Sequence, residues 1–350
     1  MLFKSLVILA AASSVLAAPL MERQSNASTC TDPDLRRAWH TLKDSEKKAY
    51  IDAELCLMSK PAAHGLRGAR TLFDEMQSVH VLQSEIAHWV GQFFPFHRLY
   101  LRAHEYLLQT ECGYEGAHPY WAEHLDAGAF SNATIFSAEN GFGGNGVGDL
   151  LCVEDGPFAN YTNPLGPGYK VSDHCIERRF ADRVSRGSSA AVVEACMAKT
   201  NFLEFWNCVE MTSHGAGHGG VGAQMTNPIS SPGDPIFYMH HAWLDRIWAK
   251  WQEEDPSVRM TEMGGNNRPR LGMAMPGAGG NPFGSGPPTP GLGSMEDMIR
   301  PDDVPAPAII GDPGNVTTLN HLITMYGILP NRTISEVMNT KGSYLCYEYD

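Results

Sequence analysis

Six of the fourteen histidines fall into two groups of three, and their type and spacing are the strongest sign of chemistry in the chain. The groups are His80, His88 and His97, and His214, His218 and His241. Imidazole nitrogen suits copper, zinc or nickel, and three around one ion leave positions open for an outside ligand. Copper has the highest affinity in the divalent series and useful redox chemistry. The pattern therefore favours two copper ions.

Helical spacing supports the second group. His214 and His218 are four residues apart, so one helix face would present both about a turn apart, although Gly215 and Gly217 weaken the helix prediction. A pair with this spacing is weak evidence alone, because it occurs by chance and also serves zinc sites. The evidence is strengthened by a helix predicted from Asp234 through Trp251, which supplies a third histidine.

That third ligand is one of two consecutive histidines, His240 and His241, which lie on different faces of the predicted helix. We choose His241, because Asp245 follows four residues later on its face and could orient the imidazole. The alternative for Asp245 is an exposed carboxylate paired with a nearby cation. His240 would then contact the ligand residues without binding the metal itself. Phe237, also on the His241 face, either stacks on a ligand ring or fills the core.

The first group needs two further helices. His80 and His88 are eight residues apart on a helix predicted over 71–89, and His97 opens a helix predicted over 97–110. Other helical patterns cover 34–59 and 182–209, and no alternating strand pattern or internal repeat is found. Residues 264–290 are dense in Gly and Pro and indicate an irregular loop. The chain is therefore expected to be mainly α, with long irregular loops.

The first 18 residues have the pattern of a secretory signal peptide. Lys4 precedes an apolar run from Leu6 through Leu16, and small residues lead to cleavage after Ala17 or Ala18. The run is too short to span a bilayer, which needs about 20 apolar residues. We expect residues 19–350 to form a single secreted, extracellular domain.

Cysteine usage and charge narrow the class further. The eight cysteines allow up to four disulfides, and none forms a Cys-x-x-Cys pair of the kind that binds zinc or does redox chemistry. A formal charge of −13 argues against nucleic acid or membrane as a partner, and a small neutral substrate fits better. Five glycosylation sequons agree with secretion: Asn26, Asn132, Asn160, Asn315 and Asn331.

Two long motifs carry a resemblance to a known family. Residues 88–101 read HWVGQFFPFHRLYL, and residues 234–248 read DPIFYMHHAWLDRIW. They resemble the first and second copper motifs of the tyrosinase and catechol oxidase (polyphenol oxidase) family. The resemblance extends to residues 42–56 and to the Tyr-x-Tyr at 347–349, and it is closest to the short fungal type. It thus covers nearly the whole chain after the signal peptide.

The family implies a four-helix bundle that holds a type-3 dicopper centre, with one group of three histidines on each copper. His80 has one rival among the upstream histidines, His64. The implied activity is oxidation of small phenols, with reduction of O2 to water. The alternatives are a tyrosinase that also hydroxylates monophenols and a haemocyanin-like O2 carrier. A zinc hydrolase lacks support, because no glutamate lies in a His-Glu-x-x-His arrangement.

Departures from the family pattern bear on the substrate. Many fungal relatives have a cysteine, crosslinked to the second histidine, where this chain has Ile86. Monophenol-hydroxylating members often place Asn after the first ligand of the second copper, where with a Glu it holds a water. Here that residue is Gly215, while Glu210 matches the water-holding Glu. Half of the pair is missing, so o-diphenol oxidation is favoured. Candidates for the pocket wall follow His218: Gly219, Val221 and Met225.

Overall fold

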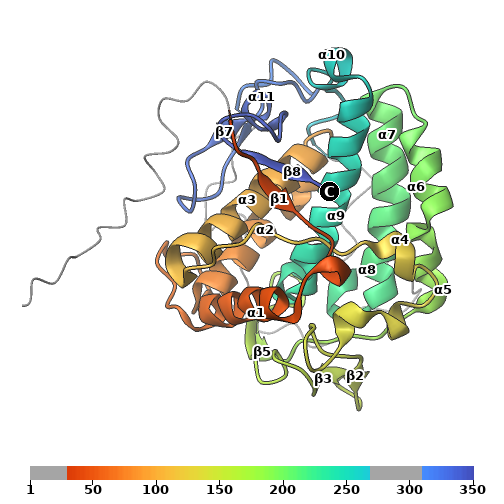
Figure 1. The fold of residues 1–350 in the computed structure, drawn as a ribbon. Helices are drawn as coiled ribbons and strands as arrows, with labels where there is room; N and C mark the ends of the chain where they lie inside the picture. Colours follow the sequence, from red (N-terminus) through yellow and green to blue (C-terminus); the bar gives the residue numbers. More distant parts are fainter. Residues whose placement is uncertain (1–29, 269–309) are drawn as a thin grey trace, which may run out of the picture.

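Four long helical segments form the centre of the molecule (Figure 1). The computed structural model describes residues 30–268 and 310–350. The central segments are α2 (Leu72–Ala87), α3 (Phe93–Cys112), α9 (Ile236–Glu254), and a continuous run of α7 (Phe202–Val209), a π-helical turn (Glu210–His214) and α8 (Gly215–Val221). They confirm the predicted mainly α bundle. The predicted signal peptide, Asn26 and most of the 264–290 loop lie outside the described residues.

Shorter elements surround this bundle, and the strands occur only as pairs within the described ranges. The remaining helices are α1 (Asp44–Ser59), α4 (Glu123–Asp126), α5 (Asp182–Ser185), α6 (Ala190–Met197), α10 (Pro256–Arg259) and α11 (Ile334–Val337). The paired strands are β1 (Asp34–Arg36) with β8 (Tyr347–Tyr349), β2 (Gly146–Val147) with β3 (Cys152–Val153), β4 (Asn163–Leu165) with β5 (Val171–His174), and β6 (Leu322–Ile323) with β7 (Arg332–Thr333).

Local sequence explains where the ligand-bearing helices begin. Thr71 caps α2: its hydroxyl accepts a hydrogen bond from the Asp74 N–H, and the Asp74 carboxylate accepts one from the Thr71 N–H. α3 starts at Phe93, four residues before the predicted start at His97, because Pro95 is tolerated in the first turn of a helix. His97 therefore lies one turn inside α3.

Aromatic side chains pack three of the central helices together. The Phe94 ring of α3 stacks on Phe205 of α7 with centroids 5.4 Å apart and on Trp248 of α9 at 5.3 Å. Phe205 also stacks on Trp251 at 4.6 Å. All four side chains are buried. Burial of rings this large contributes strongly to the stability of a core, so these contacts fix α3, α7 and α9 relative to one another.

A buried carboxylate, Asp245 of α9, joins the bundle to both ends of the described chain. It accepts hydrogen bonds from Arg98 Nε at 2.6 Å, from the Tyr347 hydroxyl at 2.5 Å and from the Tyr349 hydroxyl at 2.7 Å. Arg36 lies 3.7 Å away and stacks on the Tyr347 ring. Since β1 carries Arg36 and pairs in parallel with β8, one acidic side chain connects α9, α3, β1 and β8.

All eight cysteines are paired, which confirms the prediction from their even number. The bonds are Cys30–Cys346, Cys56–Cys112, Cys152–Cys175 and Cys196–Cys208. The first joins the segments that lead into β1 and β8, and the second joins α1 to α3. Disulfides stabilise chiefly by restricting the unfolded chain.

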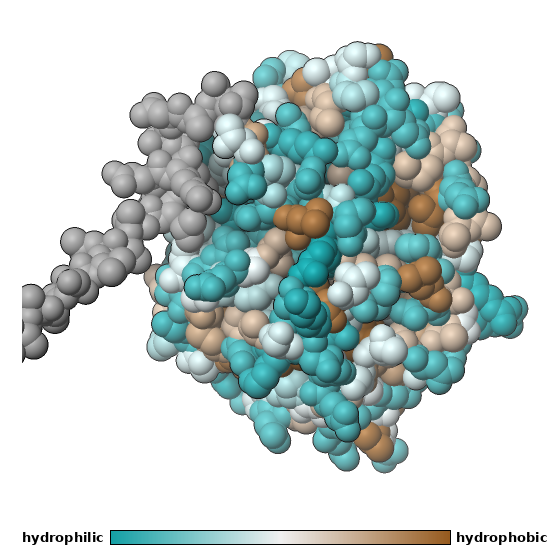
Figure 2. Space-filling model, in the orientation of Figure 1, coloured by the Kyte–Doolittle hydropathy of each residue, from teal (hydrophilic) through white to brown (hydrophobic). Residues whose placement is uncertain are grey.

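The molecular surface is mainly hydrophilic on the face shown in Figure 2, where hydrophobic residues lie as separate patches. The four described sequon asparagines are exposed: Asn132, Asn160, Asn315 and Asn331. Within residues 30–268 and 310–350, no helix is long and apolar enough to cross a membrane.

Replacing Asp245 with Asn should lower the free energy of unfolding by about 3 kcal/mol, because Arg98 would be left buried beside an uncharged partner and Arg36 would keep only Glu105. Chemical denaturation of purified protein measures the change. Asp149→Asn, on an exposed residue, is the control. A loss for Asp245→Asn no larger than the loss for the control would contradict the role given to this carboxylate.

Stability should also fall in acid through Glu105. Burial alone would raise the pKa of this carboxyl, but the charges of Arg36 and Arg102 more than offset it and lower the pKa to about 2, from an ordinary value of 4.5. Its stabilising contribution is therefore complete above about pH 4.5 and is lost as the pH falls through about 2. Denaturation of wild type and Glu105→Gln from pH 6 to pH 2 should give curves that converge in acid; parallel curves would disprove the assignment.

Candidate metal centre

The structure brings seven histidines into two clusters, the first buried and the second partly buried. His80, His88 and His97 form the first, and His214, His218, His240 and His241 form the second. Within each cluster, one nitrogen from every ring lies within 4.8 Å of the others. The clusters adjoin, since the His88 and His214 rings stack with centroids 5.9 Å apart. The rival candidate His64 instead contacts Glu75, with Nδ1 2.8 Å from the carboxylate.

Main-chain carbonyl groups orient five of these rings, and they also decide where the ring proton sits. A carbonyl oxygen only accepts, so each Nδ1 must carry the proton and each neutral ring keeps its lone pair on Nε2. The bonds run from His80 to Ile229 at 2.9 Å, His88 to Ser84 at 2.9 Å, His97 to Phe93 at 2.8 Å, His214 to Glu210 at 3.2 Å and His218 to Met225 at 2.6 Å.

The free ring nitrogens are the observation that points to metal. Nε2 of His80, His97, His214 and His240 is buried and has no hydrogen-bond partner among the described residues. Buried polar atoms are nearly always paired, so four unpaired nitrogens in two adjoining clusters require an explanation. A copper ion bound by each cluster would satisfy those of His80, His97 and His214, because neutral imidazole with a fixed Nδ1–H is the form that binds metal.

Burial keeps these rings neutral. It lowers the pKa of His88 to about 4 and that of His240 to about 3, and it holds the pKa of the other five well below the ordinary range. At neutral pH no proton has to leave a ring before a metal binds.

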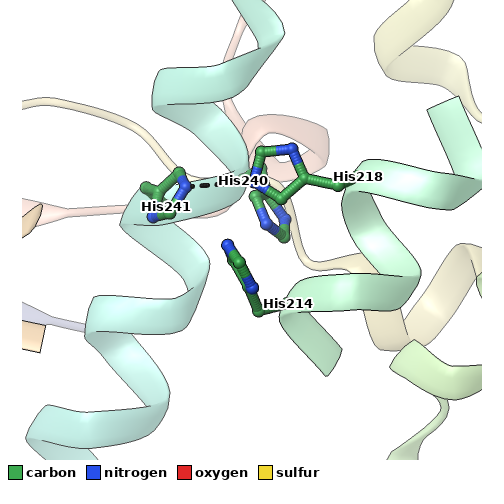
Figure 3. Close-up of side chains that lie close together, drawn as sticks. All are labelled: His214, His218, His240 and His241. Carbon is green, nitrogen blue, oxygen red and sulfur yellow. Dashed lines mark hydrogen bonds between the residues drawn. The ribbon is translucent and has the colours of Figure 1, made fainter. Parts of the chain in front are cut away.

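The contact between His218 and His241 favours His241 as the third ligand of the second cluster. Their Nε2 atoms lie 3.3 Å apart, and Figure 3 shows the two rings facing each other from α8 and α9. Two nitrogens that bind one ion tetrahedrally at about 2.0 Å lie about 3.3 Å apart. The His241 ring also stacks on His97, 4.1 Å away and nearly parallel, and packs against Phe237 at 4.1 Å.

His240 is supported by a residue that sequence reasoning missed. Its Nδ1 hydrogen-bonds to the buried carboxylate of Glu123, which also accepts from the Ser188 hydroxyl at 2.8 Å. Glu123 lies 117 residues away, and no local pattern marks it. Gly217 allows the close approach, because a Cβ there would lie 2.2 Å from the His240 ring. The glycines that weakened the helix prediction are compatible with α8.

The structure corrects three predicted roles. Asp245 was expected to orient His241, but its carboxylate bonds to Arg98, Tyr347 and Tyr349; helical spacing identified the face but not the partner. Val221 and Met225 were expected to line a pocket, but both side chains are fully buried, because Val221 ends α8 and Met225 lies in the short 3-10 turn that follows, and both pack into the core. Met225 instead offers its carbonyl oxygen to His218.

Gly215 and Gly219 lie on the outer side of α8. Gly215 is exposed, and a Cβ there would meet nothing nearer than the Glu210 carbonyl oxygen at 3.9 Å. Gly219 is half-buried, and a Cβ there would lie 2.7 Å from Val184, an exposed side chain of α5. This side of the second cluster therefore has small residues beside an exposed apolar one.

Glu210 lies one turn before His214, and both of its carboxylate oxygens accept hydrogen bonds. Oε1 accepts from the Trp89 N–H and Oε2 from the Trp206 indole N–H, each at 2.6 Å. Burial raises the pKa of Glu210, but the N–H donors that face its two oxygens lower it and favour the ionised form, in which both oxygens accept. The residue belongs to the π-helical turn, a feature frequent at functional sites.

Comparison with known proteins agrees with this geometry. Residues 70–254 match the model of the common central domain of tyrosinase. The chain is 30% identical to the tyrosinase ustQ of Aspergillus flavus over 91% of its own length and 80% of that protein, and 25% identical to the N-acetyl-6-hydroxytryptophan oxidase ivoB of Emericella nidulans over the full length of both. A mutant polyphenol oxidase from Thermothelomyces thermophila superposes with a TM-score of 0.74 at 26% identity, covering 91% of this chain and 88% of that one.

Gly217→Ala should disrupt the second cluster, whereas Gly215→Ala should not. The added methyl group has no space beside His240 at 217 but open space at 215, where alanine in a helix is favourable by about 1 kcal/mol. Copper bound after reconstitution and dialysis, measured by elemental analysis, should fall for Gly217→Ala only. Equal copper contents in the two variants would contradict the packing described.

His241→Ala should reduce bound copper from about two ions to about one per chain, because the second cluster loses a direct ligand. His240→Ala should retain more copper, because its proposed role is support from outside the ligand set. The same analysis ranks the two variants. Greater copper loss for His240→Ala would show that the Glu123-supported ring is the ligand.

Proposed function

The chain belongs to the tyrosinase family, and we propose that it is a secreted dicopper oxidase that converts o-diphenols to o-quinones and reduces O2 to water. One observation carries the proposal: two adjoining clusters of neutral histidines hold buried Nε2 atoms without a hydrogen-bond partner, beside an exposed glycine, Gly215, at which a Cβ would meet nothing nearer than 3.9 Å. His80, His88 and His97 would hold one copper, and His214, His218 and His241 the other.

The fit of the residues to copper rests on their chemistry. Each cluster offers three neutral imidazoles and no charged ligand, which suits copper and leaves open positions. When bound, two copper ions supply the exchange of electrons between a phenol and O2, a two-electron match for an o-diphenol. The protein's part is to fix five of the six ligand rings through their Nδ1–H groups, so that they need not reorient during the reaction.

The preference for o-diphenols rests on Gly215 and Glu210. A monophenol has an ordinary pKa near 10, so it needs a positioned base before it can bind a metal as phenolate. Gly215 has no side chain that could orient a water molecule. Both oxygens of Glu210 already accept N–H groups, and this leaves the carboxylate poorly placed to hold a catalytic water. The proton of a monophenol would therefore leave slowly.

The side of the site near Gly215, Gly219 and Val184 suits a neutral aromatic substrate. Val184 is 47% exposed and offers an apolar contact, Gly219 lets Val184 pack close to α8, and Gly215 leaves open space. A formal charge of −13 disfavours anionic phenols. Since one relative is named as an oxidase of a hydroxylated tryptophan, hydroxyindoles belong in the substrate panel beside catechols and tyrosine.

Secretion is supported by the leader pattern at 1–18 and by four disulfides, which persist in oxidising compartments. Glycans on the exposed sequon residues Asn132, Asn160, Asn315 and Asn331 fit the same route, and Asn26 is a further candidate. Mass spectrometry of protein collected from culture medium tests both the cleavage site and the glycans.

We predict that purified, copper-loaded protein oxidises catechols much faster than matched monophenols. Gly215→Asn should raise the monophenol rate relative to the diphenol rate by roughly tenfold, below the range of a fully positioned base, because the new amide can orient a water. Quinone formation followed after any lag, with a trace of diphenol to reduce the coppers, gives both rates.

Gly215→Ala is the matched control for that substitution, since it adds bulk without an amide. If it raises the ratio as much as Gly215→Asn does, orientation of water is not the cause. If wild type hydroxylates tyrosine as fast as it oxidises the diphenol product, the tyrosinase alternative replaces the diphenol proposal. Reversible O2 binding without turnover of any phenol would instead favour an O2 carrier.

A further inference from the structure

The backbone directly after the ligand His88 is held in an unfavourable conformation. Trp89 has φ = 55°, in the left-handed region that residues with a Cβ rarely adopt. Such a conformation persists only when surrounding contacts enforce it. Because His88 ends α2 as its C-cap, the His88–Trp89 peptide sets the direction in which the ligand leaves the helix.

Two side chains form hydrogen bonds with the main chain of Trp89. Its N–H donates to Glu210 Oε1 at 2.6 Å, and its carbonyl oxygen accepts from Asn266 Nδ2 at 3.0 Å. The neighbouring Gly91 is packed so tightly that a Cβ there would lie 1.9 Å from the Gly264 carbonyl oxygen. This short segment therefore has little freedom once both contacts are made.

Glu210 makes hydrogen bonds at both histidine clusters through different atoms, to His214 itself in the second and to the residue after His88 in the first. Its carboxylate holds the peptide after His88, while its main-chain carbonyl oxygen accepts the Nδ1–H of His214 at 3.2 Å. The second carboxylate oxygen is tied to the buried indole of Trp206, on the same helical run. Two N–H donors thus meet one carboxylate, and only a side chain with two acceptor oxygens satisfies both.

We propose that Glu210 is a positioning residue that sets the place of His88 relative to His214, and hence the spacing of the two metal sites. It acts through Trp89 and the His214 ring. The proposal rests on the copper assignment of the proposed function, but it is independent of the phenol oxidised. It differs from a role in holding a catalytic water, which would leave the metal content unchanged.

The test is the copper content of Glu210→Gln. An amide side chain has one acceptor oxygen and one donor NH2 group, so one of the two N–H groups would face the NH2 group. The peptide after His88 should then no longer be held firmly by residue 210. We expect bound copper to fall from about two ions to about one per chain. Glu204→Gln, an exposed glutamate on the same helical run, should keep both coppers.

A double variant separates positioning from general damage. Trp206→Phe removes the indole N–H, so in Trp206→Phe/Glu210→Gln the amide oxygen can accept from Trp89 while its NH2 faces no donor. Copper content should return to nearly that of Trp206→Phe alone, which itself should stay near two. A double variant with no more copper than Glu210→Gln, or one that does not fold, overturns the proposal.

Two further outcomes keep this proposal distinct from the proposed function. If Glu210→Gln retains both coppers and changes only the monophenol rate, Glu210 serves the substrate and the positioning role is wrong. If wild-type protein itself takes up no copper, the proposed function fails first. Elemental analysis and thermal unfolding of the metal-free proteins require no substrate, so they give the answer for any phenol.

Discussion

Asp245 is the charge on which much of the architecture depends. It accepts hydrogen bonds from α3 and from both tyrosines of β8, and it lies near Arg36 of β1. It also lies one turn after His241 on α9. The helix that carries this proposed metal ligand is therefore the helix that ties together the two ends of the described chain. A change in the packing of α9 around Asp245 would therefore also move His241.

A second constraint is the set of main-chain carbonyl groups around the histidine rings. Carbonyl oxygens from α2, α3, the π-helical turn and the segments after α8 fix the proton on Nδ1 of five histidines. Backbone acceptors cannot be removed by substitution of their own side chains. The main chain thus orients most of the rings of the candidate metal site. Side chains such as Glu123 and Glu210 add further hydrogen bonds around it.

Sequence reasoning identified the elements and the two groups of histidines, because helical spacing is local information. It assigned Asp245 to His241 since both share a helix face, but the partner on another element, Arg98, leaves no trace in that spacing. Glu123 and the contact between Glu210 and Trp89 were missed for the same reason: more than a hundred residues separate each pair. Val221 was misplaced because the glycines of α8 suggested a loop, and Met225 because residue type does not show that the turn after α8 packs its side chain into the core.

The Cys30–Cys346 bond gives the protein a covalent topology with its own consequence. Between these residues the chain is a closed ring, with a sequence separation of 316. A protease that cuts the chain once between these residues produces two fragments that stay joined by the disulfide. Only a reductant can separate them. On a gel run without reductant, the cleaved protein would therefore keep the mass of the intact chain. The two fragments would separate only on a gel run after reduction.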